Sequence, residues 1–100
     1  MKKGKVITYV EPVKEYLATL IDVEKELLDL YALLVLTRGI QTTWEDVHDA
    51  WSIWKYNSDP THKSIVPFEK LTKEVQEIDR EYAEAIRRTA AMINPRNINF

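Results

Sequence analysis

Aromatic and basic side chains able to bind a ligand are concentrated in residues 44–80, which hold all three tryptophans and both histidines. His48, Trp51 and Lys55 are spaced so that a helix places them on one face. Such a face forms a cationic and aromatic wall, which can stack a base and attract a phosphate. The alternative is structural: Trp51 and Trp44 pack in the core, and Lys55 lays its stem along the surface.

A second pair of basic side chains, His62 and Lys63, falls in a stretch without helical periodicity. Loops held by a rigid scaffold often carry binding groups, so this pair can belong to the same site. The alternative is a solvent-exposed basic turn. The two histidines, His48 and His62, together with Asp79 would offer three metal ligands, but no short histidine spacing typical of a metal site is present. We therefore expect no metal.

Asp79 interrupts an apolar stripe, and a carboxylate placed there needs a hydrogen-bond donor or costs desolvation energy. We expect a structural role, in which Asp79 accepts hydrogen bonds from an indole, from His48 or from loop amides and holds the irregular segment. The functional alternative is that it orients a ligand-contacting histidine or arginine. Its neighbour Arg80 either reaches a phosphate or belongs to a solvated face with Arg87 and Arg88.

Recognisable catalytic patterns are missing from the sequence. It contains no Ser-His-Asp order, paired catalytic carboxylates or zinc spacing, and its two glycines are too few for a phosphate-cradling loop. We therefore predict that the protein is not an enzyme and uses no cofactor.

Composition indicates a single soluble domain. The chain has 100 residues and a formal net charge of −2, so no basic excess favours nucleic acid. Cysteine is absent, which fits a reducing compartment. Because the sequence also shows neither a secretory signal nor a transmembrane run, we expect a cytoplasmic protein without a membrane partner.

Hydrophobic periodicity predicts an all-α fold, a small bundle of three main helices at about 12–38, 43–56 and 72–93. Thr43 and Thr72 are expected N-caps, and Gly39 is the expected left-handed stop of the first helix. An irregular segment is expected at 57–71, where Pro67 holds the preceding residue extended. The β-branched residues at 5–10 are compatible with a short strand.

Residues 27–36 (LLDLYALLVL) are apolar around nearly the whole helix. A helix of this kind is covered on several sides, and this chain has few other helices to cover it. We therefore expect a homodimer formed through this stretch.

Three segments together resemble the repeat first described in ryanodine receptors: VHDAW at 47–51, HKSIVPFEKL at 62–71 and EIDR at 77–80. Lys63 stands where that repeat usually has proline, and the loop at 57–61 is shorter. The N-terminal half is also similar to small proteins of actinobacteria and their phages. The positions that match the repeat are His48, Trp51, His62, Val66, Pro67, Phe68, Leu71, Asp79 and Arg80.

The resemblance implies a helical domain, paired in the receptors, that senses nucleotide-derived ligands. We therefore predict a small-molecule-binding protein that recognises a cyclic dinucleotide or an ADP-ribose-type signal without chemistry, such as a phage sponge for host immune signals. The alternative is a helical protein–protein interaction module. The ligand-binding residues we expect are His48, Trp51, Lys55, His62, Lys63, Phe68 and Arg80, supported structurally by Asp79, Pro67 and Trp44.

Overall fold

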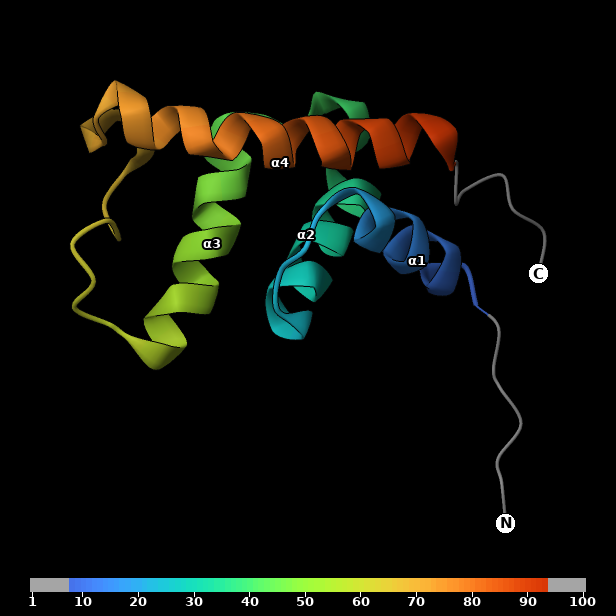
Figure 1. Ribbon diagram of the computed structural model, residues 1–100, viewed down its shortest axis with the longest axis horizontal. Coiled ribbons are helices and arrows are strands. Elements are labelled where there is room, and N and C mark those ends of the chain that lie inside the picture. Colours follow the sequence, from blue (N-terminus) through green and yellow to red (C-terminus); the bar gives the residue numbers. More distant parts are fainter. Residues whose placement is uncertain (1–7, 94–100) are drawn as a thin grey trace, which may run out of the picture.

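The computed structural model describes residues 8–93, and every regular element in this part of the chain is a helix, as the all-α prediction requires (Figure 1). Two short 3-10 helices, η1 (Gly39–Gln41) and η2 (Phe68–Lys70), lie among the α-helices. The four α-helices are α1 (Val10–Leu20), α2 (Lys25–Thr37), α3 (Trp44–Ser58) and α4 (Lys73–Met92).

The first predicted helix, at 12–38, is wrong as a single element, because the chain is extended between α1 and α2. Ile21 has backbone angles of −136° and 156° and ends α1, although its side chain remains buried. A continuous helix over 12–38 would be about 40 Å long. The break instead lets α1 pack against α2, where the amine of Lys14 lies 2.7 Å from a carboxylate oxygen of Asp29.

The predicted strand at 5–10 is also not found where the structure can test it. Residues 5–7 lie outside the described part of the chain, and Val10 already belongs to α1. Thr8 instead starts the helix, because its backbone nitrogen and its hydroxyl both donate to the same carboxylate oxygen of Glu11. At residues 8–10, the described part of the expected segment, the chain therefore leads into a helix.

The predicted start and stop signals of the other helices are confirmed. Thr43 caps α3 by accepting from the backbone nitrogen of Asp46, whose carboxylate accepts in return from the backbone nitrogen of Thr43. Thr72 caps α4 by accepting from the backbone nitrogen of Val75, without a reciprocal hydrogen bond from that residue. Gly39 follows α2 with a φ of 58°, the left-handed conformation that glycine adopts without strain.

Helix α4 lies across the other three α-helices and packs against each of them (Figure 1). Its buried positions, Ala83, Ala85 and Ile86, meet a core that includes Leu17 of α1 and Tyr31 of α2. Arg87 also joins α4 to the segment before α3, because its guanidinium donates to the main-chain oxygen of Thr42 over 2.7 Å. The long helix therefore fixes the positions of α2 and α3, which carry much of the candidate site.

Most of the apolar stretch 27–36 is covered by the chain itself. Leu27, Tyr31, Ala32 and Val35 are buried among the chain's own helices, and Leu33 is the exposed large side chain of this stretch. The break divides the first predicted helix into α1 and α2, so the chain has four α-helices where the periodicity predicts three. Much of the cover expected from a second copy is thus provided within one chain.

No helix in residues 8–93 is both long and apolar enough to cross a membrane.

Candidate functional site

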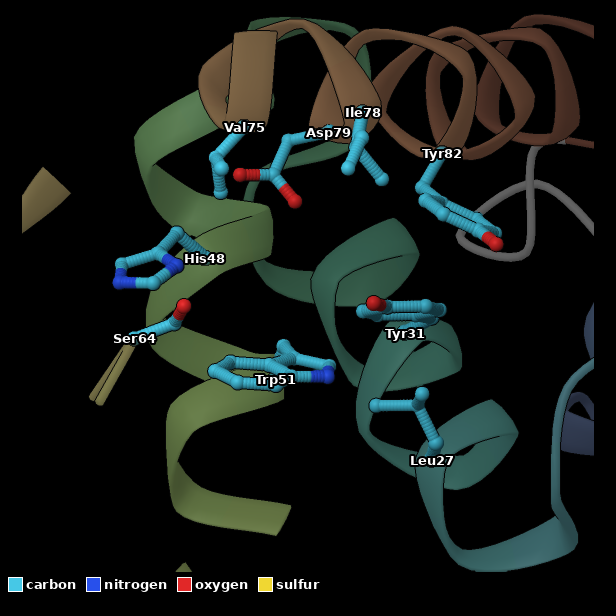
Figure 2. Close-up of a pocket in the computed structure, with 9 residues that line it drawn as sticks. All are labelled: Leu27, Tyr31, His48, Trp51, Ser64, Val75, Ile78, Asp79 and Tyr82. Atoms are coloured by element: carbon cyan, nitrogen blue, oxygen red, sulfur yellow. The ribbon is translucent and has the colours of Figure 1, made fainter. Parts of the chain in front are cut away.

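A cavity of about 330 Å³ opens between α2, α3, α4 and the loop that precedes η2. Figure 2 shows Trp51 on one side of it and Asp79 on the opposite side, with His48 at one end and the two tyrosines at the other. The walls are therefore mostly apolar or aromatic, with a few polar groups directed inward, as is usual for ligand sites. The lining residues are Leu27, Tyr31, His48, Trp51, Ser64, Val75, Ile78, Asp79 and Tyr82.

Three of the predicted site residues come together, because both histidines contact the ring of Trp51. The imidazole of His48 stacks beside the indole with centroids 5.8 Å apart and planes 21° apart. His62 meets the same indole edge-on, with centroids 5.2 Å apart. Trp51 itself is half-buried, so one part of the indole is held by the histidines while another part faces the cavity (Figure 2).

His48 links α3 to the irregular loop. Its side chain is only 3% exposed, and its Nε2 lies 2.7 Å from the main-chain oxygen of Val66. A carbonyl oxygen only accepts, so Nε2 carries the proton in this hydrogen bond. The ring of Phe68 also lies near His48, with ring centroids 6.2 Å apart. These contacts hold the loop in place, and Ser64 of the same loop reaches the cavity.

Asp79 is the unusual group of the cavity. Its side chain is 8% exposed, and no hydrogen-bond donor in residues 8–93 reaches its Oδ2 atom. Burial raises the pKa of this carboxyl from 3.8 to about 6, and nearby His48 opposes the rise. The donors expected from an indole or from loop amides are not at Oδ2. A buried acceptor without a partner therefore faces a space large enough for a ligand.

Two tyrosines complete the wall beyond Asp79. Tyr31 of α2 and Tyr82 of α4 have ring centroids 5.7 Å apart, with a tilt of 32°. Burial raises the pKa of the Tyr31 hydroxyl, and the negative charge of Asp79 adds to this effect. Tyr31 is consequently neutral at physiological pH, and both tyrosines offer aromatic surface with a hydroxyl group.

The other predicted binding residues do not line the cavity. Lys55 lies over the ring of Trp54, 5.5 Å from its centroid. Lys63 is exposed beside Ser64. Arg80 is on the outer face of α4, where its Nε lies 2.6 Å from Glu77.

Two of the three residues predicted to be structural, Trp44 and Pro67, do not line the cavity, whereas the third, Asp79, does. Trp44 begins α3 and packs, half-buried, against the core, in line with its structural alternative. Pro67 precedes η2, and its main-chain oxygen accepts from the backbone nitrogen of Lys70.

Several lining residues were not proposed from the sequence as site residues. Leu27, Tyr31, Val75, Ile78 and Tyr82 were read only as apolar stripe positions. Ile78 is largely exposed although it borders the cavity, so it lies at the opening. The one available signal was Asp79, since a carboxylate on an apolar stripe indicates that its helical neighbours face an unusual environment.

No metal centre accompanies the cavity in the described residues, where no three histidine, cysteine, aspartate or glutamate side chains are grouped to hold an ion.

Fold and site together define an all-helical domain with an aromatic, acid-containing cavity formed within a single chain. The chain belongs to a family described as a domain of unknown function (DUF7701), whose model matches residues 6–91. No curated protein and no solved structure matches the chain.

Proposed function

We propose that the protein binds a small nucleotide-derived ligand and performs no chemistry on it. The observation that carries this proposal is the cavity of about 330 Å³, in which the indole of Trp51 faces the carboxylate of Asp79. Its volume is at the lower end of the range for small-molecule sites. A space of this size takes one flat ring system rather than a whole dinucleotide, so the base enters and the remainder stays at the opening.

Trp51 is the surface on which a base would stack. Stacking on an aromatic side chain is worth about 1–3 kcal/mol per base and tolerates different bases. His48 and His62 hold the indole from two directions, so its orientation is fixed before a ligand arrives. A rigid platform loses little entropy on binding, which favours affinity.

The loop next to the cavity supplies a cation for the phosphate. Ser64 lines the cavity, and Lys63 is exposed directly beside it. Within residues 8–93 the lining itself contains no lysine or arginine. A phosphate would therefore remain at the rim near Lys63, as a point-charge contact, while the base occupies the interior.

The hydrogen bonding of His48 favours binding over catalysis. The Nε2 proton of His48 is committed to the main-chain oxygen of Val66, so this nitrogen is not available as an acid or base. The hydroxyl groups of the described lining belong to Ser64, Tyr31 and Tyr82, and no hydrogen bond from any of them to Asp79 activates one as a nucleophile. A protein of this kind senses or sequesters its ligand, and a phage sponge for a cyclic dinucleotide or an ADP-ribose-type signal is one form of this function.

The test is calorimetric titration with AMP, GMP, ADP-ribose and cyclic dinucleotides, together with thermal shift at about 1 mM ligand. We expect at least one of them to bind and to raise the melting temperature. Trp51→Leu should abolish this binding, whereas Trp54→Leu, which alters an indole outside the cavity, should leave it intact. If none of these ligands binds the wild-type protein, or if Trp54→Leu is as damaging as Trp51→Leu, the proposal fails.

A second candidate, a helical interaction module or homodimer, is favoured by one exposed apolar groove. The side chains of Leu33 and Ile53 are 51% and 64% exposed and border a depression between α2 and α3. Adjacent exposed apolar side chains are a common feature of interaction surfaces. Sedimentation velocity distinguishes the two states: a dimer that Leu33→Glu dissociates supports this candidate, and a monomer at all concentrations opposes it.

A further inference from the structure

We propose that the group bound against Asp79 is a flat group with two N–H donors on one carbon, as in an amidinium, a guanidinium or the N1 and N2 edge of guanine. This inference rests on the proposed function and specifies which chemical class occupies the interior of the same cavity. The observation behind it is the juxtaposition of an unpartnered carboxylate oxygen with the face of an indole.

The carboxylate requires a donor. Oδ2 of Asp79 is buried and has no partner in residues 8–93, and Figure 2 shows the carboxylate above Trp51, with one oxygen directed down toward the indole and the other to the side of His48. A carboxylate that is ionised accepts through both oxygens, and its strongest partners are forked pairs of N–H groups. A ligand with this fork satisfies the oxygen that the chain itself leaves without a partner.

Within residues 8–93, no lysine or arginine pairs with Asp79. The groups that face it are His48 from α3, Tyr31 from α2 and, on its own helix, Tyr82. Neither tyrosine carries positive charge, and His48 uses its Nε2 for the loop. Arg80, the arginine next in sequence, is paired with Glu77 and Glu84 on the outer face. Positive or donor character must therefore be supplied by the ligand.

The indole selects a flat group over a compact anion or a bulky chain. Trp51 lies across the cavity from the carboxylate, and a cation or a ring edge between them meets the electron-rich face of the indole (Figure 2). Guanidinium-type groups are planar and stack on aromatic faces, unlike the ammonium of lysine. A phosphate placed there would instead meet the negative charge of Asp79.

The same chemistry separates two nucleobases. Guanine offers N1–H and an exocyclic amino group side by side, so both donate to one carboxylate. Adenine offers one amino group next to the N1 acceptor, whose lone pair would face an oxygen of Asp79. A site built around an ionised carboxylate therefore prefers guanine, because adenine would place its N1 acceptor against an acceptor oxygen of Asp79.

The experiment compares matched ligands at pH 8, where the carboxyl is ionised. Benzamidine is tested against benzamide, its neutral isostere, and GMP is tested against AMP, with affinities measured by calorimetry and by chemical shifts of the indole N–H groups. We expect benzamidine to bind at least about tenfold more tightly than benzamide, or GMP at least about tenfold more tightly than AMP. Preference for benzamidine alone identifies a cationic ligand, and preference for GMP alone identifies a neutral base; both support the shared donor pair.

Asp79→Asn should remove these preferences, because an amide presents one acceptor and one donor in place of two acceptors. Asp49→Asn, which changes an exposed carboxylate on α3, is the matched control and should leave them unchanged. Equal binding of benzamidine and benzamide together with equal binding of GMP and AMP would overturn the inference, as would preferences that survive in Asp79→Asn. In that case nucleotide binding that depends on Trp51 would leave the proposed function standing, whereas loss of all binding would remove both.

Discussion

The Nε2 atom of His48 lies 2.7 Å from the main-chain oxygen of Val66, eighteen residues further along the chain. This hydrogen bond ties the middle of α3 to the loop at 59–67, whose other hydrogen bonds within the described residues are short-range, such as those from Ile65 to His62 and from Ser64 to His62. The loop carries Ser64, which borders the cavity. One buried side chain therefore helps to hold this side of the cavity in place.

His48→Ala should destabilise the protein by roughly 2–4 kcal/mol, because it removes a buried hydrogen bond and leaves a void beside Trp51. We also expect the loop to open. Hydrogen exchange at residues 62–66 should therefore increase by more than the loss of global stability accounts for. Urea unfolding and exchange measured by mass spectrometry provide the two quantities.

His62→Ala is the matched control for this histidine. The Nδ1 of His62 accepts from the backbone nitrogen of Ser64 over 3.0 Å, so this hydrogen bond lies within the loop, and His62 meets α3 through the edge-on contact of its ring with Trp51. Its loss should cost about 1 kcal/mol and leave α3 protected. Equal effects of the two substitutions would show that the loop is held by other contacts.

Local sequence signals predicted the helices well where a cap accompanies the periodicity. Thr43 and Thr72 cap their helices as expected because their hydroxyls accept from backbone nitrogens three residues ahead. The break between α1 and α2 was missed, although a signal was present: the apolar positions pause between Ile21 and Leu27, where a continuous helix would need one more. Four of the five intervening residues, Val23 excepted, are charged.

The site was only partly predictable, since His48 and Trp51 share one helix face whereas Tyr31 and Tyr82 come from separate helices. Their proximity follows from how α4 crosses α2, and no spacing within the sequence encodes that crossing. The position of Arg80 outside the cavity lining has a local cause. Arg80 has acidic neighbours three and four residues away on its own helix, and these local pairs form before any distant ligand contact.

Asp79→Asn should stabilise the protein above pH 7 by roughly 1–3 kcal/mol, because it removes a buried charge that no donor in the described chain satisfies at Oδ2. In the folded state the pKa of Asp79 is raised to about 6 from 3.8. The folded protein thus binds more protons than the unfolded chain between these values. The contribution of Asp79 to the free energy of unfolding therefore falls as pH rises from about 4 to about 6 and is constant above that.

The measurement is urea unfolding of both proteins between pH 4 and pH 8. The difference between Asp79→Asn and wild type should be small at pH 4 and largest at pH 8. Asp49→Asn, on the exposed surface of α3, should stay within about 0.5 kcal/mol of wild type at every pH. A variant that is less stable than wild type at pH 8 would indicate that Asp79 accepts a stabilising hydrogen bond after all.

Thr43→Ala should cost about 1 kcal/mol, because it removes the side-chain half of the capping box at the start of α3. Asp46 would keep its ion pair with Arg38, whose Nε is 2.8 Å away, so the loss remains local. Chemical unfolding measures the cost. Thr61→Ala, at an exposed position in the turn after α3, is the control and should have almost no effect.

Gly39→Ala should destabilise the protein by about 1 kcal/mol, because Gly39 has a φ of 58° and side chains disfavour this conformation. Crowding is not the cause, since an added Cβ would lie 3.8 Å from the Cβ of Ala90. For a domain of this size the cost corresponds to a melting temperature lower by about 4–8 °C. Gly39→Asn should lose less than Gly39→Ala, because asparagine tolerates the left-handed region better. If alanine and asparagine are equally damaging, the loss arises from contact with α4 rather than from the backbone.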